Sequence, residues 1–449
     1  MKVTVVCSSE DPASQNIKQQ LLGMAAWEEE DGDYKCYGYL NFEIVEVRDK
    51  LIFQDCIDRK LDTDLIIFAS RHKSDISPLP LLTAHFSGNV ADARLGGKSH
   101  QLVRAAPKAL RSLMYNLKKF SDVAITLEAT HHGPSDIVKP CVFIELGSSE
   151  AEWRNQQMAK TIAKAIFALD FDLLSSECPT AVGFGGNHYA ARHTELLYSS
   201  DVCFGHIFPL YQLEYLDKEL IRSAFENSAG DFAYFDRKYM GRFKGKIESL
   251  IKELGYEVLR SRDVREHGGL PWKKYLALRR EVKKHELCDT NKNLRISTTL
   301  RDGICDDTRG FQLNLIKMEL AVVHKAQNVD RNAVRRLIDA EDVVCLERSD
   351  GYIEEILADQ DVDTESLIKR LQDGCIEILK EHYDIEYSND KSNIYILENK
   401  FNPQLAKTLG VDQGPLFAEL ASGKPVRVDG RLIMPDEVHS TVKKALKIN

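Results

Sequence analysis

Residues 121–153, SDVAITLEATHHGPSDIVKPCVFIELGSSEAEW, decide the fold class of this chain. Two runs within it, AITL at 124–127 and CVFIEL at 141–146, have the length of strands and are almost wholly apolar. Such runs are typical of strands buried on both faces of a parallel sheet. A cluster of N-cap residues at 148–150 then opens an amphipathic pattern over 149–170. The stretch therefore predicts strand, turn, strand and helix.

The same alternation extends to both sides of this stretch, through the first 265 residues. Strand-like apolar runs are separated by amphipathic helical patterns such as the one over 106–120. This order predicts an α/β domain whose mainly parallel sheet is covered by helices on both faces. The other strand-like runs are KVTVVC at 2–7, NFEIVEV at 41–47, DLIIFAS at 64–70, TAVGF at 180–184 and VCFGHIF at 202–208.

The pattern of the chain changes near residue 266. Residues 267–300 are polar and basic, mostly helical patterns follow, and a final stretch of strands and turns ends the chain. A chain of 449 residues is expected to form two to three domains. We therefore predict a main α/β domain over 1–265, a basic linker and helical extension over 266–390, and a small C-terminal accessory segment over 391–449.

Composition excludes several classes of protein. Apolar residues make up 43% of the chain and charged residues 29%, which is normal for a globular protein. There is no apolar run of about 18 residues, so no transmembrane helix is expected. The N-terminal residues do not fit a signal peptide. None of the ten cysteines forms a C-x-x-C pair, and we expect a cytoplasmic protein with reduced thiols.

Basic residues gather in two stretches although the net charge is −9. Residues 93–120 contain no acid, and residues 237–284 contain only scattered acids, whereas residues 341–365 are strongly acidic. Local basic faces are compatible with binding the backbone of a structured RNA. Solvated helix faces are the alternative interpretation of either stretch.

Histidines and carboxylates follow the apolar runs of the first 210 residues. Ligands of open α/β sheets bind beyond the carboxyl ends of the strands, so these side chains predict one shared site. Because they can bind metal or transfer protons, they favour a hydrolytic enzyme over a passive binding module. The residues at these ends are Arg71 and His72, His85, Glu128 with His131 and His132, Glu145, His188 with His193, and His206.

The segment TLEATHHGP at 126–134 carries the densest group. If 123–131 is a strand, Glu128, Thr130 and His132 share one face and His131 points to the other. A carboxylate and an imidazole on one face form half of a metal site, or a general base with its orienting group. We predict Glu128 as a catalytic residue, with His132 or His85 as the general base.

Two turns are predicted to bind substrate through backbone N–H groups. Ser87, Gly88 and Asn89 follow His85, and the N–H groups of such a turn can hold an oxyanion or a phosphate. A plain turn is the alternative. A second, glycine-rich turn before His188 lets backbone approach a ligand, but it lacks the Lys-Ser/Thr of a P-loop, so an NTPase is not predicted. Its candidate contacts are Gly185, Gly186 and Asn187.

The mixture of histidines and carboxylates favours a catalytic zinc site. Structural zinc prefers four ligands rich in cysteine, whereas open catalytic sites use histidine and carboxylate. The sequence has neither a G-x-S-x-G elbow nor a cysteine-nucleophile signature, which disfavours serine and cysteine hydrolases. The candidate metal ligands are His85, Glu128, His131, His132, Glu145, His188 and His206.

Five motifs together resemble the archaeal and plant type of D-aminoacyl-tRNA deacylase. They are SRH at 70–72, HFSGN at 85–89, EATHHGP at 128–134, FIELGSSEAEW at 143–153 and GFGGNHYA at 183–190. The resemblance covers residues 1–265 and implies hydrolysis of the ester between a D-amino acid and the 3′ end of tRNA. It also implies two zinc ions per chain and a three-layer α/β/α sheet of the phosphorylase/peptidyl-tRNA hydrolase kind.

The partner implied by this resemblance is tRNA charged with D-amino acids. We expect a monomer that binds neither membrane nor DNA, and Arg71, Lys108 and Arg111 are the cationic residues predicted to bind substrate. Residues 409–438 are similar to a stretch of tRNase Z enzymes, but the His-x-His-x-Asp-His metal motif of those enzymes is absent. We therefore predict an accessory element there and not a second nuclease.

Three alternatives stay open on the sequence alone. One is a non-catalytic tRNA-binding module in which zinc is only structural. Another is a zinc exopeptidase or amidohydrolase that acts on a small acyl substrate. The last keeps the deacylase activity but needs no catalytic metal, because the terminal ribose hydroxyl assists the reaction.

Overall fold

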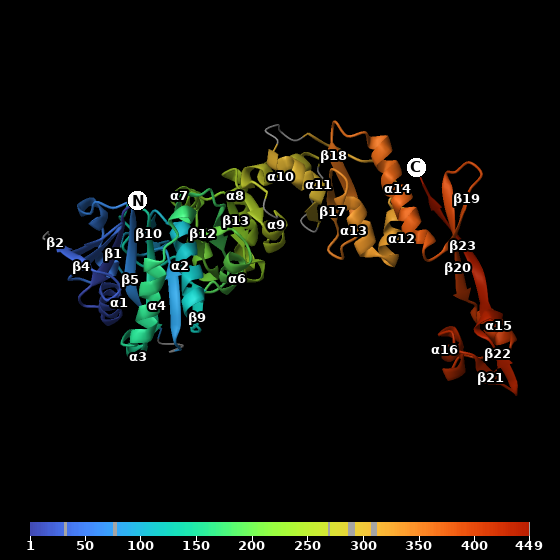
Figure 1. Ribbon diagram of the computed structural model, residues 1–449, viewed down its shortest axis with the longest axis horizontal. Helices are drawn as coiled ribbons and strands as arrows, with labels where there is room; N and C mark the ends of the chain where they lie inside the picture. Colours follow the sequence, from blue (N-terminus) through green and yellow to red (C-terminus); the bar gives the residue numbers. More distant parts are fainter. Residues whose placement is uncertain (31–33, 75–78, 268–269, 286–291, 307–311, 449) are drawn as a thin grey trace. The chain divides into compact units, whose positions relative to one another are not determined.

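The computed structural model describes residues 1–30, 34–74, 79–267, 270–285, 292–306 and 312–448 (Figure 1). The chain divides into two compact units, Met1–Arg265 and Glu266–Asn449, which are described separately below. Among the described residues, no helix has both the length and the apolar character that crossing a membrane requires.

Unit 1 is built on an eight-stranded sheet with the order β2-β3-β4-β1-β5-β10-β6-β9. Strands β4, β1, β5 and β10 are parallel neighbours, and every residue of β1 and β10 is buried. Strand β6 then pairs antiparallel with β10, and β9 runs parallel to β6. The strands are β1 (Val3–Ser8), β2 (Glu28–Glu30), β3 (Lys35–Tyr39), β4 (Phe42–Val47), β5 (Leu65–Lys73), β6 (Leu81–His85), β9 (Ala124–Leu127) and β10 (Cys141–Ser148).

A second, wholly parallel sheet follows in unit 1, with the order β12-β11-β13-β14. Right-handed connections place the helix after β11 on one face and the next two helices on the other. Unit 1 is therefore a mixed α/β fold with mainly parallel strands. Its elements here are β11 (Thr180–Phe184), α6 (Ala191–Ser199), β12 (Cys203–Phe208), α7 (Lys218–Ser228), β13 (Phe232–Phe235), α8 (Lys244–Glu253) and β14 (Glu257–Leu259).

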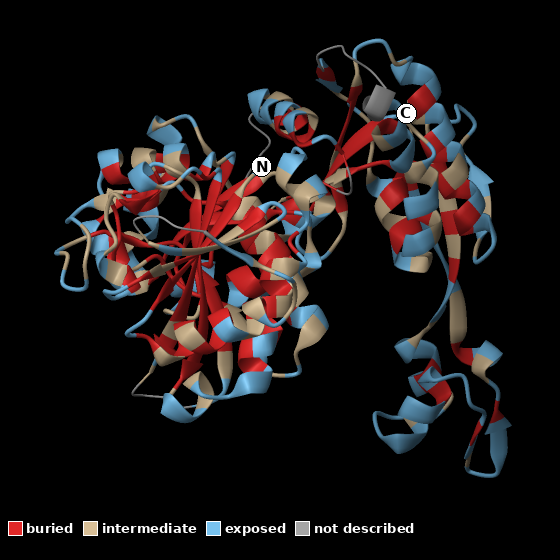
Figure 2. Ribbon diagram, turned by 60° about the vertical axis from the view of Figure 1, so that its left-hand side comes forward, coloured by how far each residue is buried: buried red, intermediate tan, exposed pale blue. Residues whose placement is uncertain are grey.

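Three helices, α1 (Pro12–Leu22), α2 (Pro107–Phe120) and α4 (Gln156–Phe167), cover one face of the large sheet. Helix α4 lies between the other two and contacts both. In Figure 2 the strands are red, the colour of buried residues, and the helices carry exposed residues on their outer sides.

The helix predicted over 149–170 is interrupted. Ser149 caps only the short α3 (Glu150–Trp153), through a capping box with Glu152, and Asn155 then starts α4 as a new N-cap.

Unit 2 combines helices with an antiparallel sheet that the sequence analysis did not identify. The sheet has the order β15-β17-β18-β16, and α12, α13 and α14 pack with it around one apolar core. The elements are α10 (Trp272–Lys284), β15 (Asn293–Ile296), α11 (Thr298–Asp306), β16 (Leu313–Leu315), α12 (Ala321–Val329), α13 (Arg331–Asp339), β17 (Val343–Glu347), β18 (Ile353–Asp359) and α14 (Thr364–Lys380).

The last part of unit 2 is an antiparallel sheet of β19 (Asp384–Tyr387), β20 (Asn393–Phe401) and β23 (His439–Lys447). Ile394, Ile396 and Leu446 join the apolar core under the helices, so the start and end of the predicted 391–449 segment belong to that core. The chain segment that joins β20 to β23 forms a small separate apolar core. It includes elements α15 (Pro403–Thr408), α16 (Pro415–Ala421), β21 (Val426–Val428) and β22 (Arg431–Ile433).

Candidate active site

Seven side chains, five histidines and two glutamates, gather in unit 1 and are called the His–Glu cluster here. They fall into three groups of potential metal ligands, each with its ligand atoms within 4.8 Å of one another. Most of these side chains are buried. The members are His72 on β5, His85 at the end of β6, Glu128, His131 and His132 after β9, Glu145 on β10, and His188 after β11.

Strand register places the first members on one face of the large sheet. His72 pairs with Gly147, and His85 pairs with Phe143, on opposite sides of β10. Paired residues, and residues two positions apart along a strand, project to the same face. Glu145 lies between Phe143 and Gly147 on β10, so its carboxylate faces the side chains of both histidines.

Strand direction brings the remaining members to the same place. Strands β6 and β9 run opposite to β5 and β10, so the carboxyl ends of β6 and β9 lie beside the middle of β10. The residues do meet, but the expectation that they would do so at one carboxyl edge of parallel strands is wrong. The structure gathers them because two strands turn back against the others.

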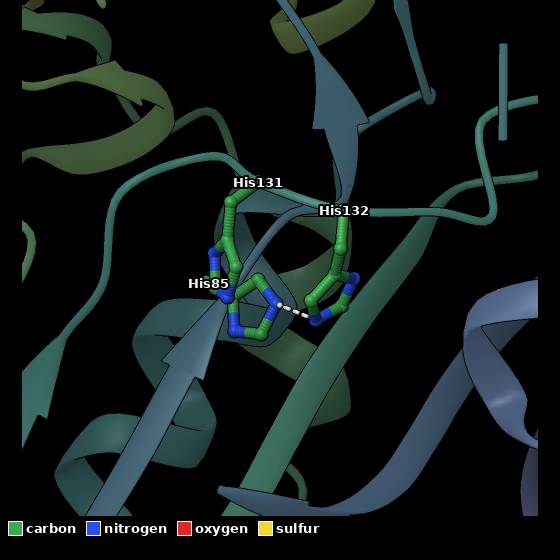
Figure 3. A group of neighbouring side chains, drawn as sticks. All are labelled: His85, His131 and His132. Carbon is green, nitrogen blue, oxygen red and sulfur yellow. Dashed lines mark hydrogen bonds between the residues drawn. The ribbon is translucent and has the colours of Figure 1, made fainter. Parts of the chain in front are cut away.

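The expected alternation in TLEATHHGP is also wrong. Strand β9 ends at Leu127, and the chain after it follows no strand periodicity. Glu128 and His131 belong to the same potential ligand group, and Thr130 instead turns away from it. His132 adopts a left-handed backbone conformation with φ of 44°. Figure 3 shows that the rings of His85, His131 and His132 point toward one another.

The outward-facing ring nitrogens of the cluster are held by fixed partners. Nδ1 of His131 lies 2.8 Å from the Ala129 carbonyl oxygen, and Nδ1 of His132 lies 2.6 Å from that of Gly133. Because a carbonyl oxygen only accepts, each Nδ1 carries the hydrogen. The inward Nε2 of a neutral ring then presents a lone pair.

Two tyrosines hold the other rings in the same way. The Tyr189 hydroxyl lies 3.2 Å from Nε2 of His72, and the Tyr211 hydroxyl lies 3.1 Å from Nδ1 of His188. Outer partners of this kind are typical of histidines that bind metal, because they fix the tautomer and the ring orientation.

Among the inward-facing atoms, Nε2 of His85 and Nε2 of His132 lie 3.2 Å apart and share a hydrogen bond (Figure 3), whereas the Glu128 carboxylate has close neighbours without one. The Glu128 oxygens lie 3.1 Å from Nδ1 of His72, 3.3 Å from Nε2 of His188 and 3.5 Å from Nδ1 of His85. Yet among the described residues neither oxygen, nor Nδ1 of His85, has a hydrogen bond of acceptable geometry, although all three atoms are buried. Unpaired buried polar atoms are costly, and a cation among them would satisfy carboxylate and imidazole together. The donor set therefore fits a metal such as zinc.

The protonation states agree with this chemistry. Burial opposes ionisation of Glu128, but its contacts with His188, His72 and His85 outweigh burial and hold its pKa well below the usual value. Burial lowers the pKa of His132 to about 3, and that of His131 also falls well below normal. Neutral imidazoles beside an ionised carboxylate are the forms that bind metal.

His72 behaves differently from the other rings. Burial acts to lower its pKa, but the contacts with Glu128 and Glu145 prevail and raise it to about 11. The proton on this ring balances the two carboxylates, and a metal ion bound to His72 would have to take the place of that proton.

A cavity of about 290 Å³ opens beside the cluster. Its wall includes members of the His–Glu cluster and three cationic residues, so it joins metal-competent groups to positive charge. The lining residues are Asp11, Lys50, Leu51, Ile52, Ser70, Arg71, His72, Lys73, Leu95, His131, His132, Glu145 and His188.

Comparison with known proteins places the chain in a family. Residues 59–259 match the family model described as D-aminoacyl-tRNA deacylase. A curated D-aminoacyl-tRNA deacylase of Methanococcoides burtonii is 39% identical over 99% of this chain and 96% of its own length. This chain belongs to the D-aminoacyl-tRNA deacylase family.

Some similar proteins are shorter than this chain. A curated D-aminoacyl-tRNA deacylase of Methanosarcina barkeri is 40% identical over 60% of this chain and 92% of its own length. A crystal structure described as a conserved protein of unknown function is 37% identical, with a TM-score of 0.55. It covers 59% of this chain and 96% of its own length. Both matches are about as long as unit 1.

Some residues predicted for the deacylase site lie elsewhere. Nδ1 of His206 lies 3.0 Å from the Thr130 hydroxyl, and its Nε2 lies 2.9 Å from the Val103 carbonyl oxygen. Both ring nitrogens are thus engaged outside the cluster, so the metal role predicted for His206 is corrected to a structural one.

The predicted turn at 87–89 is not an open cradle. Gly88 donates its N–H to the His132 carbonyl oxygen at 2.7 Å, and β7 (Gly88–Asn89) pairs with β8 (Gln101–Leu102). The Asn89 amide donates to the carbonyl oxygens of Gly96 and Lys98. Ser87 is buried, and its hydroxyl has no hydrogen-bond partner in the part of the chain that the structure describes. This segment supports the His132 loop and does not offer its N–H groups to a ligand.

The glycine-rich turn at 185–187 serves packing and positioning. A Cβ on Gly185 would come within 2.8 Å of the Asp236 carbonyl oxygen, and one on Gly186 within 3.4 Å of the Asp236 carboxylate. Gly185 therefore makes room for neighbouring protein, whereas at Gly186 the added atom would be in ordinary contact and the φ of 87° is what favours glycine. The Asn187 carbonyl accepts the Ala190 N–H, and the turn places His188 at the cluster.

Lys108 and Arg111 on α2 do not line the cavity, and both donate hydrogen bonds to backbone carbonyl oxygens of neighbouring segments. The guanidinium of Arg111 donates to the carbonyl oxygens of Leu197, Ser200 and Val202 near the end of α6. Lys108 donates to carbonyl oxygens of residues 174 and 176. Both cations brace the fold, so the predicted substrate contacts are corrected, whereas Arg71 does line the cavity.

His72 was predicted to lie at the shared site but not to bind metal, and neither Tyr189 nor Tyr211 was named as a site residue. His72 follows a strand-like run, and that position was signal enough to include it among the ligands. Tyr189 and Tyr211 gave no such signal, because their contacts with His72 and His188 depend on loops that meet only in the folded chain.

Proposed function

We propose that this chain hydrolyses the ester bond of D-aminoacyl-tRNA, releasing the free D-amino acid and tRNA, with zinc held by the His–Glu cluster. One observation carries this proposal: outer partners orient the histidines, and their inner nitrogens converge on a buried, unsatisfied carboxylate beside a cavity. Ligand-binding cavities measure roughly 300–1,000 Å³. The cavity here suits the aminoacyl end and terminal ribose of the substrate.

The proposed ligand groups share Glu128. Glu128, His131 and His188 form one group, and Glu128, His72 and Glu145 form the other. Zinc in these groups would supply Lewis acidity toward the ester carbonyl.

His132 is the proposed general base. It lines the cavity, whereas His85 is wholly buried behind it, so His132 is the ring that can reach a water molecule. In the proposed step, Nε2 of His132 exchanges its contact with Nε2 of His85 for the water that attacks the ester carbonyl carbon, and it takes a proton from that water. The same proton then passes to the departing 3′ oxygen of the ribose. Glu145, whose Oε1 lies 3.9 Å from Nε2 of His132, stabilises the charged ring between these transfers.

The rival functions fit the site less well. A structural zinc staple would close its ligand shell and favour cysteine, but the cluster contains only histidine and glutamate and adjoins a cavity. A peptidase for small acyl substrates would not need the cations Lys50, Arg71 and Lys73 around that cavity.

The first prediction concerns chirality and metal. In single-turnover assays with one tRNA, D-aminoacyl-tRNA should be deacylated much faster than the L-aminoacyl form. A chelator should abolish the reaction, and added zinc should restore it. Equal rates on both enantiomers would remove the chiral assignment, and full activity after metal removal would favour assistance by the ribose hydroxyl.

The second prediction concerns unit 2. A chain ending at Arg265 should fold and keep its preference for D-aminoacyl-tRNA, because every member of the His–Glu cluster lies in unit 1. Only affinity for tRNA is expected to fall. The measurement is single-turnover deacylation at saturating enzyme, compared with the full chain. A truncated chain that is folded but inactive would place part of the active site in unit 2.

A further inference from the structure

Arg71 has a different setting from the other cations of unit 1. Its guanidinium lies over the Trp153 ring, with 5.2 Å between Cζ and the ring centroid, and the side chain is half-buried beside the cavity. Stacking uses the face of the guanidinium and leaves its N–H edge available. No acidic partner of this guanidinium occurs among the described residues, in contrast to the paired Arg154 and Arg59.

The anions nearest to Arg71 are already engaged. Asp11 lines the same cavity, but its Oδ1 accepts from the N–H groups of Ala13 and Ser14, and its Oδ2 accepts from the Arg71 backbone N–H. Glu145 lies against His72 and His132. The cavity therefore keeps a net positive wall, to which the exposed Lys50 also contributes.

The substrate offers one anion at the right place. In aminoacyl-tRNA, the ester and the last phosphodiester are attached to the same terminal ribose, at its 3′ and 5′ sides. A cavity that admits the ester at His72 and His132 must therefore hold that phosphate close by. The fork of an arginine matches two phosphate oxygens, and this pairing is stronger than a neutral hydrogen bond.

We propose that Arg71, braced on Trp153, and Lys50 bind the phosphodiester on the 5′ side of the terminal nucleotide and so position the ester at the His–Glu cluster. This inference rests on the proposed function. It makes Arg71 a positioning residue that lets the enzyme tell a tRNA end from a simple aminoacyl ester.

The test compares two substrates that carry the same D-aminoacyl ester. One is D-aminoacyl-tRNA, and the other is D-aminoacyl-adenosine, which has no phosphodiester. For Arg71→Ala, the ratio of kcat/KM for tRNA to kcat/KM for the adenosine ester should fall about 10- to 100-fold, the range of a charged hydrogen bond. The loss should lie mainly in KM, and the salt dependence of tRNA binding should weaken by about one unit.

Further variants keep the test decisive. Arg71→Lys retains the charge without the fork and should recover part of the ratio, and Lys50→Ala should lower it in the same direction. Arg154→Ala is the matched control, because Arg154 is exposed and paired with Glu150 outside the cavity. It should leave the ratio unchanged.

Each outcome has one meaning. Equal losses on both substrates, or an unchanged ratio in both Arg71→Ala and Lys50→Ala, would overturn the phosphate subsite. A loss confined to esters of acidic D-amino acids would overturn it in favour of a carboxylate subsite. If the wild-type chain cleaves neither substrate, the proposed function itself fails.

Discussion

Glu128→Gln should reduce the single-turnover rate of D-aminoacyl-tRNA deacylation by more than about 100-fold, because loss of an outer-shell partner alone costs up to that much. Glu128 belongs to two of the three potential ligand groups, and its carboxylate meets three histidines. Glutamine keeps the volume but removes the charge and turns one oxygen into a donor. The variant should also retain less zinc, measured by metal analysis of the purified protein.

Glu150→Gln is the matched control for this change. Glu150 makes an exposed ion pair with Arg154, and such pairs contribute little to stability. Its rate and zinc content should equal those of the wild type. A folded Glu128→Gln variant with wild-type rate and zinc content would show that the cluster is not the reaction centre.

Gly147→Ala should displace His72 and damage both stability and activity. A Cβ at position 147 would lie 2.5 Å from Cβ of His72 and 2.5 Å from its carbonyl oxygen. Backbone atoms of a central strand cannot move away, so the cost is that of overpacking, about 1–3 kcal/mol in the free energy of unfolding. His72 would lose its place between Glu128 and Glu145, and zinc affinity should fall with it.

Gly245→Ala makes the same chemical change where nothing lies within 4 Å of the added Cβ. Because Gly245 is in helix α8, alanine there should be neutral or slightly stabilising. Thermal unfolding, zinc titration and single-turnover rates of both variants check the prediction. A Gly147→Ala protein that unfolds and reacts like the wild type would show that His72 tolerates movement and is not a required ligand.

The local pattern of the chain predicted the strands of unit 1 well. The run CVFIEL became β10, every residue of which is buried; the run at 64–70 became its parallel neighbour β5, and the run at 2–7 became β1, which pairs parallel with β5. These strands are continuous apolar segments with both faces covered, and that requirement is written locally in the residue types. The candidate site residues could also be predicted from the local sequence, since residues that can bind metal are rare inside apolar runs.

The direction of the strands and the residues at which they end could not be predicted from the local sequence. The strand pattern of β9 stops after Leu127: the Glu128 N–H still donates to Ala84 of β6, but the following N–H groups have partners in other segments. The Ala129 N–H donates to the His188 carbonyl oxygen, and the Thr130 N–H donates to that of Ile207, each at 2.8 Å. No local periodicity encodes such contacts, so the alternation argument placed His131 on the wrong face.

The sequence by itself determined which residue types could form the site and that they would lie on or just after strands, because apolar runs and the histidines and glutamates at their ends are local properties. Only the tertiary structure decided which of them meet. It reversed β6 and β9 against β10, which brought His85 and Glu128 to Glu145, and it engaged His206 and Arg111 elsewhere. Pairing between distant segments sets strand direction and register, and it therefore decides which side chains share a site.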